Sequence, residues 1–229
     1  MPDAPKLDKT CPDKTDLDKI DTLDEADLHQ AIDTTITYYD RAAESYRDRT
    51  WDHDVTQNYD ALLDELQGDP PFAILDIGCG PGRDLLYFKS KGHEAVGLDG
   101  SKEFVEMARS QTGCTVWHQN FLSMDLPPAR FDGVFANASL FHVPRQELPR
   151  ILRELHATLK AGGVLFCSNP CGDNREGYAR ERYGCFHDLE AWRGFVTQVG
   201  FVEVDHFYRP TGLPRDQQPW LATVWRKPR

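Results

Sequence analysis

The sequence has 229 residues, with 37 acidic side chains against 26 basic ones and a formal net charge of −11. This length predicts one domain of ~150 residues with an appendage, and the 40% share of hydrophobic residues is that of a globular chain. The acidic balance argues against a nucleic-acid partner, since binding phosphates requires a surface rich in Lys and Arg.

Residues 1–33 differ from the rest, because they hold ten acidic residues against four lysines and no aromatic residue. We expect an acidic, disordered tail, with a docking segment for a partner as the alternative. Leu23, Leu28 and Ile32 are spaced so that they could begin a short helix. The first residues lack the basic and apolar segments of a secretory signal, which predicts a cytoplasmic protein. No apolar run approaches the ~20 residues of a membrane helix, so no membrane partner is expected.

Two amphipathic helices are predicted across residues 34–70, because apolar side chains recur there at intervals of three or four. The first carries Ile36, Tyr39, Ala43 and Tyr46, and the second carries Val55, Tyr59, Leu62, Leu63 and Leu66. A Gly-Asp-Pro-Pro run at 68–71 ends the second helix. We interpret 34–70 as a helical cap on a core that spans 71–229.

The core begins with an alternation of short apolar runs and helical patterns. Strands are predicted at 72–77, 95–98, 115–118, 131–136 and 164–167, and helices at 84–91, 101–110 and 145–160. Ser101 is the expected N-cap of the second of these helices. After a further helix at 189–199, two strands at 201–208 and 220–226 are joined by a loop with no helix, so they must be antiparallel. The pattern predicts an α/β fold: a Rossmann-like, seven-stranded, mostly parallel sheet with one antiparallel strand and helices on both faces.

A glycine-rich loop follows the first strand, in Asp76-Ile77-Gly78-Cys79-Gly80-Pro81-Gly82-Arg83. Glycines at these places allow a tight turn and close approach of a ligand to the backbone. A dinucleotide site needs a third glycine where Arg83 stands, and no Gly-Lys-Ser/Thr run of a phosphate-binding loop follows. The spacing therefore suits a nucleoside with an amino-acid tail better than a pyrophosphate.

Two carboxylates flank this loop. Asp99 ends the second strand, where an acid can accept hydrogen bonds from both hydroxyls of a ribose. Asp76 lies inside an apolar run, so it needs polar partners. We expect that it either ties the loop amides together or orients a bound ammonium group.

The D-x-G-C-G-x-G run and the acid at 99 resemble those of class I S-adenosylmethionine-dependent methyltransferases, over about residues 72–227. The resemblance implies S-adenosylmethionine as cofactor, with the glycine loop around its methionine part, Asp99 at the ribose and Asn120-Phe121 at the adenine. Many relatives have Asp where this chain has Asn120. The implied cofactor-binding residues are Asp76, Gly78, Cys79, Gly80, Gly82, Arg83, Asp99, Gly100, Ser101, Asn120, Phe121 and Asn137.

Several further runs resemble the C-terminal methyltransferase domain of ovothiol-biosynthesis enzymes, over about residues 34–229. They are YYD (38–40), YRDRT (46–50), NPCGDN (169–174), RYGCFHDLE (182–190) and RPTGLPRDQQPWLATVWRK (209–227). The resemblance implies methylation of an imidazole nitrogen of 5-thiohistidine or its seleno analogue. It also implies an iron-dependent sulfoxide synthase acting upstream; the H-x-x-x-H-x-E iron motif of that enzyme is absent here, so the chain is a stand-alone methyltransferase or an excised domain.

A small acceptor is also favoured because no N-P-P-[YF] run, typical of relatives that methylate nucleic acids and protein amides, follows the fourth strand. A zwitterionic amino acid needs an arginine for its carboxylate and aromatic or acidic neighbours for its ammonium. We predict Asn137, Tyr39 and Tyr183 as catalytic residues; for Asn137, the methyltransferase resemblance implies a position at the junction of donor and acceptor. The predicted substrate-binding residues are Tyr39, Tyr46, Arg49, Asn169, Arg180, Tyr183 and His187.

Each of these acceptor residues has a plainer interpretation. The tyrosines at 39 and 46 lie on an apolar helical stripe, the arginines could be solvated surface cations, and His187 could be a structural histidine. The competing functions are a methyltransferase for another small N, S, Se or O acceptor, a nicotinamide oxidoreductase, and a non-catalytic binding module. None of the six cysteines forms a C-x-x-C pair, so no metal site is predicted.

Overall fold

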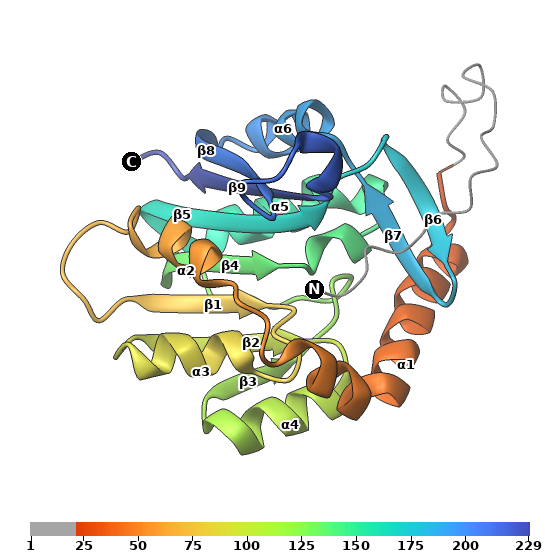
Figure 1. Ribbon diagram of the computed structural model, residues 1–229, viewed down its shortest axis with the longest axis horizontal. Helices are drawn as coiled ribbons and strands as arrows, with labels where there is room; N and C mark the ends of the chain where they lie inside the picture. The colour runs from red at the N-terminus through yellow and green to blue at the C-terminus, as the bar shows by residue number, and fades with distance from the viewer. Residues whose placement is uncertain (1–21) are drawn as a thin grey trace.

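A sheet of seven strands, ordered β3-β2-β1-β4-β5-β9-β8, forms the centre of the computed structural model, which describes residues 22–229 (Figure 1). Its strands are β1 (Ala73–Ile77), β2 (Glu94–Asp99), β3 (Thr115–His118), β4 (Phe131–Asn137), β5 (Leu159–Pro170), β8 (Val202–Arg209) and β9 (Trp220–Arg226). Strand β9 pairs antiparallel with both of its neighbours, and β1 to β5 pair in parallel. The predicted Rossmann-like sheet with one reversed strand is confirmed.

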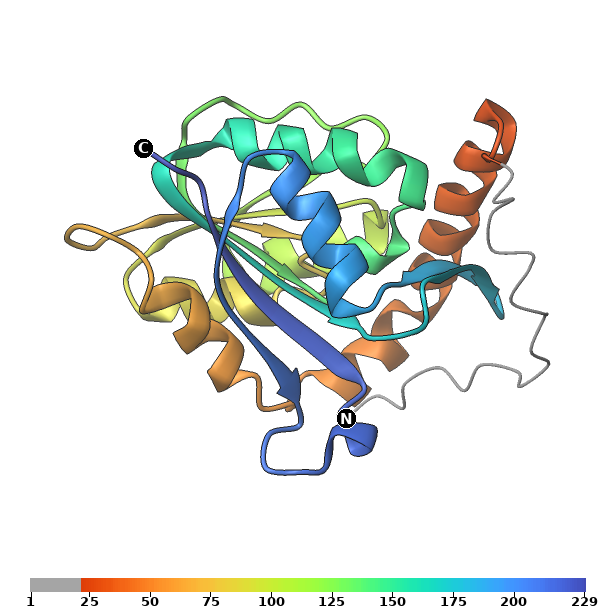
Figure 2. The same ribbon diagram turned by 90° about the horizontal axis from the view of Figure 1, so that it is seen from above.

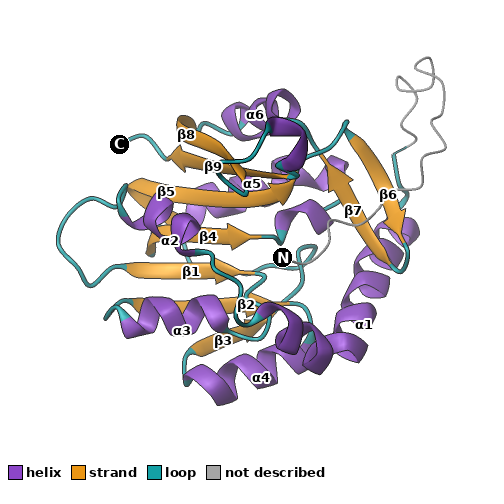
Figure 3. Ribbon diagram, in the orientation of Figure 1, coloured by secondary structure: helices purple, strands orange, loops and turns teal. Residues whose placement is uncertain are grey.

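Helices cover both faces of this sheet (Figures 2 and 3). Helices α2 (Thr56–Leu63), α3 (Arg83–Ser90) and α4 (Lys102–Thr112) pack on one face, through buried side chains such as Leu62, Phe88 and Ala108. Helices α5 (Leu148–Thr158) and α6 (Leu189–Gln198) pack on the other, through Ile151, Leu155 and Trp192. Short 3₁₀ turns span Leu140–His142, Arg145–Glu147 and Arg215–Gln217. Within residues 22–229, no helix is both long and apolar enough to cross a membrane.

Helix α1 (Glu25–Thr50) lies across the ends of the strands and contacts α4. The side chain of Asp24 caps it by accepting a hydrogen bond from the Asp27 amide at 2.8 Å. The helix therefore begins nine residues before residue 34, where the predicted helical cap starts. That boundary is wrong for residues 25–33, because Ala31 and Ile32 are buried and anchor the first turns. The remaining part of the predicted acidic tail, residues 1–21, lies outside the described residues.

The segment 169–187, predicted from the sequence to be a loop, contains a separate two-stranded hairpin. The hairpin consists of β6 (Arg175–Ala179) and β7 (Arg182–Phe186), which pair antiparallel. Helix α1 packs against β7, where the Thr35 hydroxyl accepts a hydrogen bond from the Tyr183 amide at 2.9 Å. Polar residues and two glycines interrupt both strands, so the apolar alternation that marks a strand is missing.

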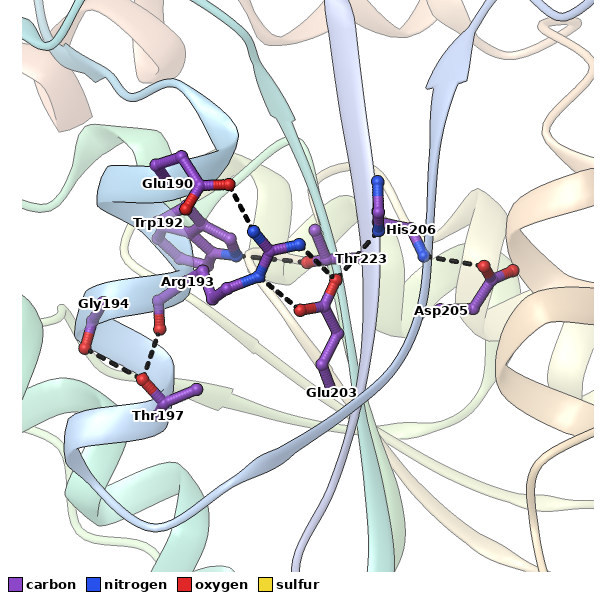
Figure 4. A network of polar contacts seen from close by, with 9 residues as sticks. All are labelled: Glu190, Trp192, Arg193, Gly194, Thr197, Glu203, Asp205, His206 and Thr223. Atoms are coloured by element: carbon purple, nitrogen blue, oxygen red, sulfur yellow. Dashed lines mark hydrogen bonds and ion pairs between the residues drawn. The ribbon is translucent and has the colours of Figure 1, made fainter.

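Two contacts join α6 to the edge of the sheet (Figure 4). The buried indole N–H of Trp192 donates to the Thr223 hydroxyl of β9 at 3.1 Å. On the outer side, the Arg193 guanidinium donates to both carboxylate oxygens of Glu203 on β8, at 2.5 and 3.0 Å. The inner bond is the one that a substitution can test cleanly, because both of its partners are buried.

We predict that Thr223→Val lowers the free energy of unfolding by about 1–3 kcal/mol, because it leaves a buried indole N–H without an acceptor while preserving the side-chain volume. Thr223→Ser keeps the hydroxyl and should lose less. Urea unfolding monitored by circular dichroism measures both variants. Equal stability of the valine variant and the native chain would show that the bond contributes nothing.

Candidate functional site

The glycine loop between β1 and α3 is shaped by two hydrogen bonds to one carbonyl. The amides of Gly78 and Cys79 both donate to the Leu98 carbonyl of β2, at 2.7 and 3.1 Å. A Cβ atom added to Gly78 would lie 2.3 Å from the Cβ of Ser139, so no side chain fits there. Gly80 has a φ of +52°, and a Cβ added to it would meet nothing within 4 Å. The loop backbone is therefore held tightly on one side and faces open space on the other.

Asp99 closes the loop from the end of β2. One carboxylate oxygen accepts from the Gly80 amide at 2.8 Å, and the other accepts from the Ser101 amide at 2.8 Å. Burial raises the pKa of this carboxyl to about 6. Each carboxylate oxygen has two acceptor positions, so both retain a lone pair for hydroxyl groups of a ligand.

A first cavity opens between this loop, the ends of β2 and β3, and helix α1. It encloses about 650 Å³, part of it open to solvent. Of the predicted site residues, it is lined by Tyr39, Tyr46, Gly78, Gly80, Asp99, Gly100, Asn120 and Phe121. These residues lie far apart in the sequence, and the fold brings them around one space.

A second cavity of about 1090 Å³, also partly open to solvent, adjoins the first along Tyr46, Gly78, Gly80 and Ala138. It extends from the glycine loop past the ends of β4 and β5 to the strands β8 and β9. The predicted site residues Cys79, Arg83 and Asn137 line it. A ligand bound under α1 and a second ligand beyond Asn137 would thus meet beside the glycine loop.

Asn137 is held in place by a buried polar network. Its side-chain oxygen accepts from the Asn58 amide at 3.0 Å, and its nitrogen donates to Asp84 at 3.2 Å. The other oxygen of Asp84 accepts from the Tyr59 hydroxyl at 2.6 Å and from the Arg83 guanidinium at 2.7 Å. The network fixes the direction of the Asn137 amide at the end of β4.

Three residues of this network, Asn58, Tyr59 and Asp84, are not predicted from the sequence. Tyr59 lies on an apolar helical stripe, which predicts only packing, and no sequence pattern marks Asn58. Asp84 offers a weak signal, because an acid in the first turn of a helix is usually explained by the helix dipole alone.

Asp76, Gly82 and Ser101 do not line either cavity. Asp76 is 1% exposed, and its Oδ2 has no hydrogen-bond partner among the described residues. Burial raises its pKa well above the usual range, with the nearby Asp84 carboxyl adding to the shift. Gly82 allows close packing on Ala108 of α4, and Ser101 accepts from the Phe104 amide as the expected cap of that helix.

Tyr39 lies in a chain of hydrogen bonds between α1 and β7. His142 donates from Nδ1 to the Tyr183 carbonyl at 2.6 Å, so its Nε2 must accept from the Tyr39 hydroxyl at 2.9 Å. Burial lowers the pKa of His142 to about 4, which keeps the ring neutral. Arg182 donates to the same tyrosine oxygen at 3.2 Å. The hydroxyl of Tyr39 is therefore committed to the protein.

The structure does not bring the remaining predicted acceptor residues to these cavities. Arg49 is exposed on α1, and Arg180 is exposed in the turn between β6 and β7. The Tyr183 side chain packs against Tyr178 of the hairpin instead.

Asn169 and His187 are buried away from both cavities as well. The His187 ring lies between Trp192 and Phe195, and neither of its nitrogens has a hydrogen-bond partner among the described residues. Burial lowers its pKa to about 4. These five predicted acceptor residues do not line either cavity, and residues 175–186 of the predicted loop form a hairpin that packs against α1.

In their place, the second cavity contains residues from the far edge of the sheet and from the end of α1. Arg209 and Trp220 face each other as a register pair at the ends of β8 and β9. His53 and Asp54 follow α1 and line the same cavity. The signal that could have found Arg209 is a lone cation at the strand end beside the Pro/Gly-rich loop.

Comparisons with known proteins agree with this geometry. Residues 74–163 match a family model described as "Methyltransferase domain". The malonyl-[acyl-carrier protein] O-methyltransferase of Pseudescherichia vulneris is 31% identical over 132 residues, which cover 56% of this chain and 49% of that protein. The trans-aconitate 2-methyltransferase of Azoarcus sp. is 34% identical over 113 residues, covering 48% and 43%. The chain thus spans less than half the length of these two relatives.

Among solved structures, the 1,6-didemethyltoxoflavin-N1-methyltransferase of Burkholderia thailandensis, with bound 1,6-didemethyltoxoflavin and S-adenosylhomocysteine, shares the fold with a TM-score of 0.73. The similarity covers 91% of this chain and 93% of that one at 22% identity. Residues 74–163 thus match a methyltransferase domain, and the chain shares its fold with a solved methyltransferase that holds S-adenosylhomocysteine.

Proposed function

We propose that the protein transfers a methyl group from S-adenosylmethionine to an imidazole nitrogen of 5-thiohistidine or its seleno analogue. The main support for a reaction between two bound ligands is that the two cavities join at Tyr46, Gly78 and Gly80. The choice of acceptor is supported by the resemblance of the runs at 169–190 and 209–227 to ovothiol-biosynthesis methyltransferases.

The first cavity fits the cofactor. Asp99 would accept hydrogen bonds from the ribose hydroxyls, and Asn120 with Phe121 would face the adenine. The open side of Gly80 leaves room for the methionine part beside the backbone. The orphaned carboxylate oxygen of Asp76 is a group that needs a positive partner, and the ammonium of that methionine part would supply one, directly or through water. Bound in this way, the cofactor offers an activated methyl group on its sulfonium.

The chain's own contribution is alignment and exclusion of water. Holding two reactants in line supplies up to about 7–11 kcal/mol of the barrier reduction. A neutral imidazole nitrogen already carries the lone pair that attacks, so no strong base is required. The Asn137 oxygen, fixed by Asn58, keeps a second lone pair that can accept from the other ring N–H and hold one tautomer. Burial raises the pKa of Tyr46, so its hydroxyl stays protonated at the junction.

An upstream iron-dependent sulfoxide synthase and a cytoplasmic location belong to the same proposal. The alternative is methylation of another small molecule at an N, S, Se or O atom. The variety of acceptors named for the relatives, from trans-aconitate to 1,6-didemethyltoxoflavin, supports keeping that alternative.

We predict that incubation with methyl-labelled S-adenosylmethionine and 5-thiohistidine yields one singly methylated product, detected by mass spectrometry and assigned to a ring nitrogen by NMR. L-Histidine, which lacks the thiol, is the matched control and should accept far less label. Absence of labelled product, with S-adenosylhomocysteine still bound in calorimetry, would reject the acceptor and leave the cofactor assignment standing.

We predict that Asp99→Asn weakens S-adenosylhomocysteine binding by roughly 10–100-fold at pH 7.5, because hydrogen bonds to a charged group are worth about 1.5–3 kcal/mol. In the native protein the pKa of Asp99 is raised to about 6, so the carboxyl becomes neutral and loses acceptor strength below that pH. The dissociation constant should therefore rise as pH falls below 6 and stay flat above it. Asp99→Asn should abolish this pH dependence, whereas Asp64→Asn, at an exposed carboxylate, should preserve it. A native affinity that is constant from pH 5 to 8 would contradict the assignment.

We predict that Asn137→Ala lowers kcat for the acceptor at least tenfold while S-adenosylhomocysteine affinity changes less than threefold, because the amide acts on the acceptor ring. Arg180→Ala, at the exposed tip of the hairpin, should leave both quantities unchanged. Steady-state kinetics and calorimetry separate the two effects. An Arg180→Ala variant with a strongly raised acceptor KM would restore the hairpin to the acceptor site.

A further inference from the structure

The second cavity contains two guanidinium groups in unequal electrostatic settings. Arg83 is paired with Asp84 at 2.7 Å and also donates to the Thr50 carbonyl at 2.8 Å. Arg209 donates only to the backbone carbonyl of Asp54, at 3.1 Å, and within residues 22–229 it forms no ion pair. The cavity therefore presents one cation that forms no ion pair among the described residues, although the Asp54 carboxylate lies near it.

The guanidinium of Arg209 is also partly shielded from water. It is half-buried at the end of β8, beside Trp220 of β9. Burial and the like charge of Arg83 lower the pKa of the Arg209 guanidinium, and the nearby Asp54 only partly opposes this. A partly desolvated guanidinium with free N–H donors is costly unless an anion completes its hydrogen bonds. Its planar fork matches a carboxylate in a bidentate pair.

The sheet order places this cation at the acceptor end of the site. Arg209 lies on β8, which is four strands from β1 in the order β1-β4-β5-β9-β8. At about 4.8 Å per strand this separation is about 19 Å at the level of the backbone. The glycine loop, which would hold the methionine part of the cofactor, follows β1. The carboxylate that reaches Arg209 should therefore belong to the acceptor.

We infer that Arg209 forms a carboxylate subsite for the methyl acceptor, which restricts the substrates to small molecules carrying a carboxylate beside the methylated ring. The Asp54 carbonyl orients the guanidinium, and Trp220 forms an aromatic wall next to it. This inference rests on the proposed function only in placing the acceptor in the second cavity. It assigns a role to a residue that the sequence analysis did not select.

The test compares the Arg209→Gln variant with an Arg215→Gln control. The control also removes one positive charge, from the loop that follows β8. Arg215 stacks on Tyr208 and does not line the cavity. We expect Arg209→Gln to raise the KM for 5-thiohistidine roughly 10–100-fold, as for loss of a charge-assisted pair. The KM for its decarboxylated counterpart, 5-thiohistamine, should be high in the native enzyme and unaffected by the substitution. Arg215→Gln should change neither value more than threefold.

Equilibrium binding separates this inference from the choice of 5-thiohistidine. Imidazole-4-acetate and L-histidine are titrated by calorimetry into the S-adenosylhomocysteine-loaded native protein and the Arg209→Gln variant. We expect measurable carboxylate binding to the native protein and at least a tenfold loss in the variant, even if 5-thiohistidine is not methylated.

Two results would overturn the carboxylate subsite. The first is that the Arg209→Gln substitution changes neither the KM for the acceptor nor the affinity for imidazole-4-acetate and L-histidine. Failure of both imidazole-4-acetate and L-histidine to bind the native protein would count in the same way. The second is that Arg209→Gln weakens S-adenosylhomocysteine itself more than threefold, which would assign the guanidinium to the methionine carboxylate of the cofactor.

Discussion

The whole site depends on the tight turn at the end of β1. Two amides of the turn share the Leu98 carbonyl, and Gly78 lies so close to Ser139 that any side chain would collide with it. This contact brings the ends of β1, β2 and β4 together, and it leaves the opposite side of the loop backbone open. Both cavities adjoin the glycine loop on that open side. The conformation of this loop therefore sets the distance between a ligand in one cavity and a ligand in the other.

Helix α1 completes the site because it is tied to the core at several places along its length. Thr35 and Tyr39 bind it to β7 and His142, and the Thr50 carbonyl at its end accepts from Arg83 of the glycine loop. The β6–β7 hairpin thus supports the first cavity indirectly, through the helix that lines it. Residues of the predicted acceptor loop therefore hold α1 in place.

Much of the fold could be predicted from the sequence, because apolar runs and helical stripes report burial directly. The glycine loop and Asp99 could be found as well, since their spacing is local and chemically specific. Asn58 could not be found, because it reaches Asn137 only through the fold and nothing in its flanking residues marks it. Arg209 carries only a weak local signal, a cation at a strand end beside a Pro/Gly-rich loop. The hairpin was missed because its strands are polar and contain Gly177 and Gly184, so their register depends on packing against α1.

The first turn of α3 shows why this loop does not serve a dinucleotide. The positive end of a helix dipole commonly neutralises a diphosphate in nucleotide-binding folds. Here that position is filled by the chain itself, because Asp84 accepts hydrogen bonds from Tyr59, Arg83 and Asn137. An incoming diphosphate would meet a carboxylate that already accepts three hydrogen bonds. The first turn of α3 thus holds an acidic side chain of its own, paired with Arg83, where a phosphate would otherwise bind.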